Sequence, residues 1–339
     1  MPLPRVQVIG IVAAALLAAS SAAAQDAEGF YKGKTIRVIV GFTAGGGADA
    51  NARLLARHLG RHIPGNPNIV VENMPGASSL KSVQYLDEAP KDGTIITVPS
   101  SGLVAQSQTD PRQFPIRLTN YSWIGSSSEE VRVCYTWSAK GIHNWDDLKQ
   151  AKEVVFGETG AGSSGYIDER MLATIFGIKV KQVLGYPGAA EKHLALERGE
   201  LDGDCGTFGD INDEWVRDKK VSMVLRFSTH LLPGIPADTP YFMDLVASQE
   251  QKQILKLLSV PAEIGRPYIV AKDVPADRLR TLRTAFDATL ADPLFLADAQ
   301  KERLTVIGPL TGEAAQDYVA DLYRSTPEVI SAAKTISGD

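Results

Sequence analysis

The run TIRVIVGFTAGGGAD, residues 35–49, decides the fold. Its first half is β-branched and apolar, which predicts a buried strand, and its second half is a glycine-rich turn. Beyond the turn, Leu55, Leu59 and Ile63 are spaced four residues apart, as on the apolar face of a helix. A strand that passes through a glycine turn into a helix is the repeating unit of α/β proteins with mostly parallel sheets.

The same unit recurs later in the chain at residues 154–165, VVFGETGAGSSG, and a helix follows. Further strand-like runs lie at residues 180–184, 221–226 and 266–271. Pro275 then opens a helix whose apolar residues again recur at helical spacing. This alternation of strands and helices predicts the α/β class throughout.

Length, composition and charge narrow the class of protein. The chain has 339 residues, of which 44% are hydrophobic, and its formal net charge is −5. Such a composition excludes a disordered or fibrous protein, and the length suggests about two domains. The acidic balance argues against a nucleic-acid partner, which would require a basic face.

Residues 1–24 have the composition of a cleavable secretory signal. A short basic start with Arg5 precedes an apolar run over residues 6–19, and small residues follow up to Ala24. The apolar run is short for a membrane span, which is the alternative reading. We therefore expect export to the periplasm and exclude this segment from the fold.

Export changes the expectation for the only two cysteines, Cys134 and Cys205. Each lies in or after a strand-like run, and thiols in an oxidising compartment commonly pair. A disulfide between them is therefore expected. The sequence alone leaves open whether their Cα atoms approach closely enough.

The two glycine turns carry the chemistry. We call residues 41–49 turn one and residues 157–165 turn two. Glycine allows close approach of a ligand to the backbone, and the first N–H groups of the following helix have no partner inside it. Since the helix dipole also favours negative charge there, each turn is a candidate anion site.

Two other interpretations of the turns remain. Gly45-x-Gly47-x-x-Ala50 and Gly160-x-Gly162-x-x-Gly165 fit dinucleotide-binding patterns, but only the first is followed by an acid at a suitable place, Glu72. Exported proteins rarely use NAD, so no cofactor is expected. The plain alternative is that both turns merely connect strands to helices.

Several stretches together resemble a known family. They are residues 34–49 with Ala52 and Arg53, residues 70–77 (VVENMPGA) and 92–94, and in the second half residues 160–163, 185–188 and 198–202. These stretches resemble the extracytoplasmic solute receptors of tripartite tricarboxylate transporters, the Bug receptors. The resemblance covers essentially all of the chain after the signal.

The resemblance implies a two-lobed periplasmic binding protein, of the Venus-flytrap type II, with a cleft between two mixed-sheet α/β domains. Lobe 1 would comprise residues 30–128 plus 266–339, and lobe 2 residues 129–265. Ligands of such receptors are usually carboxylates, and the two turns would face each other and hold one carboxylate each. The chain departs from the family pattern at Tyr166-Ile167, where His-Leu is common, and at residues 185–188, which lack a lysine. Both changes favour a less charged or more aromatic ligand.

Candidate ligand-binding residues follow from the turns and the resemblance. They are Phe42, Ala44, Gly45, Gly46, Asp49, Ala77, Ser78, Ser100 and Ser101 in lobe 1, and Thr159, Gly160, Gly162, Ser163, Ser164, Tyr186 and Asp204 in lobe 2. Asp49 is better interpreted as a helix N-cap paired with Arg53, because a carboxylate would repel an anionic ligand. Tyr186 either contacts the ligand or packs in the core, and Asp204 would bind a water or a ligand hydroxyl.

No arrangement typical of catalysis is visible, so an enzyme is not expected. His58 and His62 have a metal-ligand spacing but no accompanying acid, which indicates a structural role and no metal. We expect a monomeric receptor that captures a dicarboxylate or aromatic carboxylate and delivers it to an integral membrane permease. The alternatives are a periplasmic sensor for a signalling partner and, less favoured, an exported enzyme on the same fold.

Overall fold

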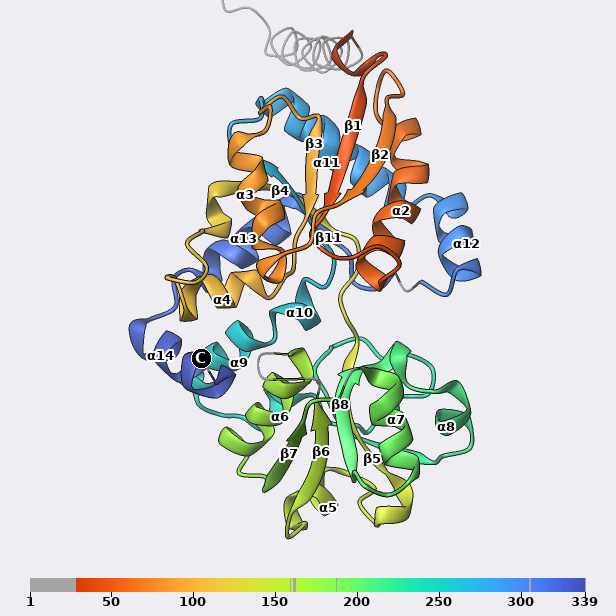
Figure 1. Ribbon diagram of the computed structural model, residues 1–339, viewed down its shortest axis with the longest axis vertical. Coiled ribbons are helices and arrows are strands. Elements are labelled where there is room, and N and C mark those ends of the chain that lie inside the picture. Colours follow the sequence, from red (N-terminus) through yellow and green to blue (C-terminus); the bar gives the residue numbers. More distant parts are fainter. Residues whose placement is uncertain (1–28, 159, 161–162, 187, 305, 339) are drawn as a thin grey trace, which may run out of the picture. The chain divides into compact units, whose positions relative to one another are not determined.

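The computed structural model describes residues 29–158, 160, 163–186, 188–304 and 306–338. The chain forms two compact units, each built around one mixed sheet flanked by helices (Figure 1). Unit 1 comprises residues 29–100, 119–127 and 266–316, and unit 2 comprises 101–118, 128–265 and 317–338. The predicted α/β class with two mixed sheets is confirmed.

The sheet of unit 1 has the strand order β11-β4-β10-β3-β1-β2. Its strands are β1 (Thr35–Val40), β2 (Asn68–Asn73), β3 (Ile95–Val98), β4 (Tyr121–Ser126), β10 (Pro267–Ala271) and β11 (Leu310–Thr311). β1 pairs in parallel with both β2 and β3, whereas β10 runs antiparallel to β3 and β4. The carboxyl ends of β1, β2 and β3 therefore meet at one edge of this sheet.

Every second residue of β1 points into the main core of unit 1. Ile36, Val38 and Val40 belong to a buried cluster that includes Leu55 of one helix and Phe286 of another. The helices of this unit are α2 (Gly47–Leu59), α3 (Leu80–Glu88), α11 (Ala276–Leu290) and α12 (Pro293–Lys301), with the start of α13 (Gly312–Leu322). From Val38 to Val40 every residue of β1 is buried, so this part of the strand is continuously apolar.

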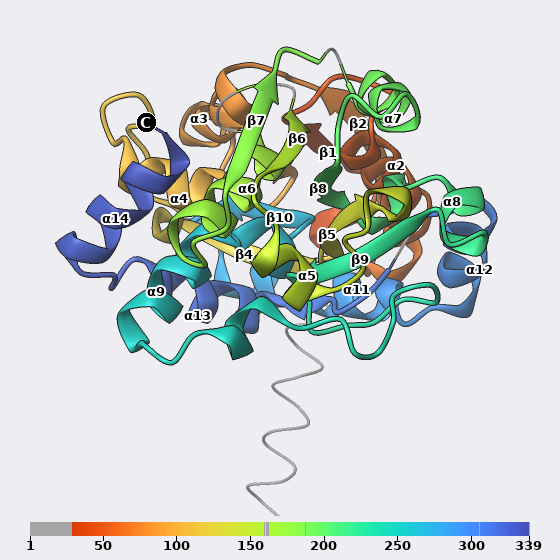
Figure 2. The same ribbon diagram turned by 90° about the horizontal axis from the view of Figure 1, so that it is seen from below.

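The sheet of unit 2 has the strand order β7-β6-β8-β5-β9. Its strands are β5 (Arg132–Trp137), β6 (Val154–Glu158), β7 (Val180–Leu184), β8 (Gly203–Thr207) and β9 (Val221–Arg226). β6 pairs in parallel with β7 and β8, and β5 runs antiparallel to β8 and β9. Figure 2 shows β9 beside β5 at the margin of this sheet.

Unit 2 contains eight α-helices among its described residues. They are α4 (Leu103–Thr109), α5 (Trp145–Gln150), α6 (Ser164–Thr174), α7 (Ala189–Glu197), α8 (Asp213–Arg217), α9 (Gln249–Leu258), α10 (Val260–Glu263) and α14 (Pro327–Ser337). The Arg170 side chain of α6 donates to the carbonyls of Thr335 and Ile336, which attaches α14 to this unit. Ser107 of α4 likewise bonds Tyr323 at 2.5 Å.

These contacts divide the chain differently from the division inferred from the resemblance. Residues 101–118 and 317–338 belong to unit 2, whereas the sequence analysis assigned both segments to lobe 1. The reason is tertiary: the apolar faces of α4 and α14 pack within unit 2, and no local pattern shows which partner an amphipathic helix chooses.

Two histidines predicted to be structural lie at and after the end of α2, His58 in its last turn and His62 in the 3-10 turn Gly60–His62. Figure 1 shows α12 beside α2. His58 Nε2 lies 2.9 Å from Asp298, and His62 Nε2 lies 2.9 Å from Asp292. Asp292 also accepts from Arg61 at 2.5 Å. The acids that the sequence spacing lacked are thus supplied by another helix, and the cluster joins α2 to α12.

Cys134 and Cys205 form a disulfide between β5 and β8. The antiparallel register places the two residues directly opposite each other, with 4.1 Å between their Cα atoms. Both are buried. The bond ties the antiparallel strand β5 to the parallel part of the sheet that carries turn two.

In the described part of the chain, no helix combines the length and apolar character that a membrane crossing requires. The predicted signal, residues 1–24, lies outside the described residues.

We predict that replacing both cysteines, Cys134→Ser with Cys205→Ser, lowers the free energy of unfolding by about 4 kcal/mol. The disulfide closes a loop with a sequence separation of 71, which limits the entropy of the unfolded chain. Urea unfolding of oxidised protein, reduced protein and the double variant measures this. Equal midpoints for the three samples would contradict the prediction.

Candidate functional site

Turn one leaves the carboxyl end of β1 and enters α2 through an exposed backbone. Ala44, Gly45 and Gly46 are all exposed, and Gly45 has φ +85°. Gly46 is the N-cap, and the Ala50 N–H donates to the Gly46 carbonyl at 2.9 Å in the first turn of the helix. The N–H groups of the preceding helical residues therefore have no partner inside the helix.

The Asp49 carboxylate holds this turn in place. Asp49 is 3% exposed, and it accepts from the Gly45 N–H at 2.8 Å and from Arg53 Nε at 2.9 Å. Asn73, at the end of β2, donates to Asp49 at 2.9 Å and to the Phe42 carbonyl at 3.0 Å. The Arg53 guanidinium lowers the pKa of Asp49 from 3.8 to about 2. The side chain is thus an internal brace of turn one.

Two expectations for turn one need correction. Asp49 is not the N-cap but the third residue of α2, from which it reaches back to the turn. The Gly45 N–H, predicted as a donor to the ligand, is bonded to that carboxylate instead. The predicted pairing of Asp49 with Arg53 is present, at 2.9 Å. The exposed backbone amides near Gly46 therefore remain available in this turn to bind a ligand.

A strained loop lies beside turn one. Gly76, Ala77, Ser78 and Ser79 have φ values of 144°, 46°, 52° and 74°. For the three residues with a Cβ this conformation costs about 1–2 kcal/mol each, and such strain is concentrated at functional sites. Ser79 Oγ donates to the Gly41 carbonyl at 3.1 Å, which fastens the loop to the end of β1. The predicted residues Ala77 and Ser78 are exposed next to this contact.

The remaining candidates of the first half lie as follows. Phe42 is half-buried and packs against the core of unit 1. Ser100 follows β3, whose carboxyl end adjoins turn one through the bond from Gly41 N–H to the Val98 carbonyl at 3.0 Å. Ser101 is buried and belongs to unit 2, so the structure does not place it with turn one.

Turn two leaves β6 and enters α6, which begins at Ser164 after the N-cap Ser163. The Ser163 hydroxyl accepts from the Tyr166 N–H at 3.2 Å and donates to Glu158 at 2.8 Å. Gly160 and Ser164 are half-buried. The predicted residues Thr159 and Gly162 lie outside the described residues. Ser163 thus satisfies the protein's own backbone rather than presenting a free hydroxyl.

Close packing beneath turn two leaves no room for larger residues. A Cβ on Gly165 would lie 1.9 Å from Glu158 Oε1, and a Cβ on Gly157 would lie 3.0 Å from the Tyr186 ring. Tyr186 is half-buried and follows β7. Its ring therefore packs against the end of β6, close to the turn.

A buried group of carboxyls surrounds the base of turn two. Glu158, Glu169 and Asp204 are each 3% exposed or less, and one oxygen of each lies within 4.8 Å of the others. Lys192 donates to Asp204 at 2.7 Å and to Glu158 at 3.3 Å. The ammonium group thus already occupies the position between two of the carboxylates that a metal ion would take.

Asp204, predicted to contact a water or a ligand hydroxyl, belongs to this buried group. Its carboxylate accepts from Lys192 and, at 3.3 Å, from the Tyr135 hydroxyl. Burial raises the pKa of Asp204 to about 6 and that of Glu169 well above its ordinary value. We therefore assign Asp204 to the support of turn two.

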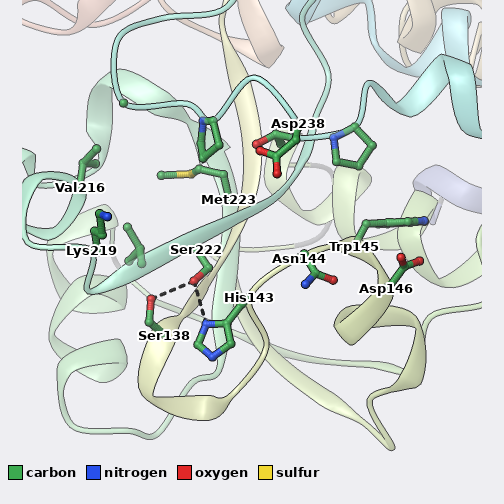
Figure 3. A pocket seen from close by; sticks show the side chains of 15 residues that line it. Ser138, His143, Asn144, Trp145, Asp146, Val216, Lys219, Ser222, Met223 and Asp238 are labelled. Carbon is green, nitrogen blue, oxygen red and sulfur yellow. Dashed lines mark hydrogen bonds between the residues drawn. The ribbon is translucent and has the colours of Figure 1, made fainter.

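Unit 2 also contains an open cavity of about 940 Å³ (Figure 3). It lies where β5 ends and β9 begins, and Ser222 bonds Ser138 at 2.9 Å and His143 at 3.4 Å in its wall. None of the predicted site residues lines it. The strand register places the cavity at the sheet edge opposite to turn two, whereas ligands of α/β sheets bind beyond the carboxyl ends of the parallel strands.

Sequence reasoning missed the side chains that support the turns. They are Asn73, Glu158, Glu169 and Lys192. Asn73, Glu169 and Lys192 bond residues 24, 13 and 12 positions away, and Lys192 also bonds Glu158 across 34 positions. Asn73 stands in the quoted run VVENMPGA, so the motif itself was a signal. A Cβ on Gly47 would lie 3.4 Å from Arg266 Nη2, which places a second guanidinium at the start of α2.

We predict that Asp49→Asn lowers the free energy of unfolding by about 2 kcal/mol at pH 7. The pKa of Asp49 is lower in the folded protein than the ordinary 3.8, so its stabilisation is complete above that value and is lost as the pH falls toward 2. The difference between wild type and variant should therefore shrink on acidification.

Denaturant titrations at several pH values test this. Asp146→Asn is the matched control, because the Asp146 side chain is 74% exposed and its pairing with Lys149 contributes little. A variant difference that stays constant between pH 7 and pH 2.5 would refute the role of the Asp49 charge.

The fold is that of solved solute-binding proteins. The chain aligns with a TctC solute-binding protein from Polaromonas with a TM-score of 0.72 and 19% identity, covering 91% of this chain and 99% of that one. It aligns with MatC from Rhodopseudomonas palustris with bound malate with a TM-score of 0.59 and 19% identity, covering 90% of this chain and 99% of that one. It aligns with an R. palustris protein with adipate with a TM-score of 0.61 and 17% identity, covering 89% of this chain and 97% of that one. The Polaromonas protein is a solute-binding protein, and the other two structures hold adipate and malate.

Sequence comparison identifies the family. No family model matches the chain. A UPF0065 protein of Bordetella pertussis is 26% identical over 197 residues, and the aligned part spans 59% of that relative's length. A UPF0065 protein of Pseudomonas sp. (strain P51) is 32% identical over 314 residues, which cover 91% of this chain and 88% of the relative. The chain therefore belongs to the UPF0065 family, the Bug family of solute-binding proteins.

Proposed function

We propose that this protein is an extracytoplasmic receptor that captures a carboxylate and delivers it to a tripartite tricarboxylate-type membrane permease. Units 1 and 2 would be the two lobes of the receptor, and residues 1–24 would direct it to the periplasm. Two proteins of the same fold hold malate and adipate, which supports an organic acid as the ligand class.

The observation that carries the proposal is the exposed start of α2. Asp49, Arg53 and Asn73 hold turn one rigidly, so its backbone is preorganised before a ligand arrives. Charge-assisted hydrogen bonds contribute about 1.5–3 kcal/mol each, and micromolar affinity requires about 8 kcal/mol. A few such bonds from turn one, together with contacts to the loop Ala77–Ser79, supply that order of affinity.

A thermal-shift screen of mono-, di- and tricarboxylates, both aliphatic and aromatic, tests the ligand class. Binding of the hit without turnover is expected of a receptor. Stabilisation only by neutral or cationic compounds would refute the proposal.

We predict that Gly46→Val weakens binding of the best carboxylate at least 100-fold while the circular dichroism spectrum stays near that of wild type. Gly46 has φ −81° and ψ 169°, which valine also adopts, and a Cβ there meets only the Thr43 carbonyl at 3.8 Å. The added side chain thus blocks the amides without disturbing the fold. Gly29→Val, at another open position, is the control. Unchanged affinity of Gly46→Val would exclude turn one from the site.

A further inference from the structure

Glu169 lies in the second turn of α6 and is 0% exposed. One of its carboxyl oxygens, Oε2, accepts from the Gln182 side-chain amide at 2.8 Å. The other oxygen, Oε1, is buried and has no hydrogen-bond partner among the described residues. An ionised carboxylate accepts hydrogen bonds on both oxygens, and a buried oxygen without a donor is destabilising. The surroundings of Glu169 therefore disfavour a negative charge on Oε1.

The Gln182 amide fixes which oxygen of Glu169 is the acceptor. Its Nε2 donates to Glu169 Oε2 at 2.8 Å and also to the Tyr166 carbonyl at 3.2 Å. If the amide nitrogen and oxygen were exchanged, the amide carbonyl would face the Tyr166 carbonyl, and two acceptors form no hydrogen bond. Gln182 is thus a donor to Oε2, which leaves Oε1 as the position for a proton.

Two other carboxyl groups face Glu169, that of Glu158 from β6 and that of Asp204 from β8. One oxygen of each of the three lies within 4.8 Å of the others. The Lys192 ammonium of α7 donates to Asp204 at 2.7 Å and to Glu158 at 3.3 Å, and the Tyr135 hydroxyl of β5 donates to Asp204 at 3.3 Å. In the described part of the chain neither donor bonds Glu169. Neighbouring carboxylates at this distance in a buried site disfavour a further negative charge.

The guanidinium groups beside α6 also have other partners. Arg132 of β5 bonds Asp168 at 2.5 Å, and Arg170 donates to two carbonyls near the end of α14. Among the described residues neither guanidinium bonds Glu169. Burial raises the pKa of Glu169 well above its ordinary value of 4.5, and the Glu158 carboxylate adds to this effect. Each element packed around Glu169 therefore favours its neutral form.

We propose that Glu169 is a buried proton-binding site, which holds a proton on Oε1 at neutral pH, donates it toward the carboxylates of Glu158 and Asp204, and makes the base of turn two sensitive to pH. This inference goes beyond the proposed function and does not depend on it. Protonation turns Oε1 from an acceptor without a donor into a donor with acceptors nearby. Loss of the proton in alkaline solution would place a further negative charge beside Glu158, which holds the Ser163 N-cap at 2.8 Å.

Infrared spectroscopy detects the proton directly, because a protonated carboxyl has a carbonyl band that a carboxylate lacks. This band should persist at pH 7 in wild type, where exposed carboxyls are ionised, and should be missing from Glu169→Gln. Glu153→Gln, at an exposed position of the same unit, is the matched control and should keep the band. Absence of the band from wild type, or its survival in Glu169→Gln, would overturn the proposal.

Isotope labelling makes the same test without a substitution. Glutamate labelled with ¹³C at the carboxyl carbon should shift the band, whereas labelled aspartate should leave it in place. This decides the outcome even if Glu169→Gln fails to fold by circular dichroism. A shift with labelled aspartate alone would assign the proton to another carboxyl, such as Asp204, and would overturn the proposal.

The pH dependence of stability gives a second readout. Unfolding exposes Glu169 and returns its pKa to the ordinary 4.5, so the stability that the raised pKa contributes is complete below that pH and is lost as the pH rises. For each pH unit between 4.5 and the folded pKa, the unfolding constant of wild type should rise about tenfold relative to that of Glu169→Gln. Urea titrations of both proteins at several pH values measure this ratio. A ratio that stays constant with pH would refute the proposal.

Discussion

The bond between the Asp49 carboxylate and the Gly45 N–H is the interaction on which the rest of turn one depends. A run of glycines has the largest conformational entropy of any segment, so it presents a defined row of amides only if something holds it. Asp49 does this from inside the helix, and Arg53 and Asn73 keep its carboxylate charged and oriented. The buried charge is tolerated because each oxygen has a partner.

Turn two is also held in one conformation by a buried carboxylate, but different side chains surround that carboxylate. There Glu158, at the end of the strand, holds the Ser163 N-cap. Lys192 bonds Glu158 in turn and is itself held by Asp204. The brace at turn one reaches back from the helix and is balanced by guanidinium groups. The brace at turn two comes from the end of β6 and belongs to a group of three buried carboxyls. Two turns with nearly the same sequence pattern therefore differ in electrostatic character.

Local sequence patterns predicted the elements well where propensity and burial agree. β1 and β7 lie where β-branched runs predicted strands, and α11 follows Pro275 as its apolar spacing indicated. The assignment of residues 101–118 and 317–338 to the first lobe differs from the observed division, because α14 is attached through Arg170 to a helix far away in the sequence. Of the residues predicted in turn two, Thr159 and Gly162 lie outside the described residues, and Ser163 caps α6.

The sequence by itself determined the α/β class, the two strand–glycine–helix units and the residue type at each turn, because these depend on backbone freedom and on short-range periodicity. Only the tertiary structure decided which side chains surround each turn. Lys192, Asp204 and Glu169 come from three different elements, and Arg266 reaches α2 from the start of β10. Charge balance at a site is a property of distances in space, and no spacing along the chain records it.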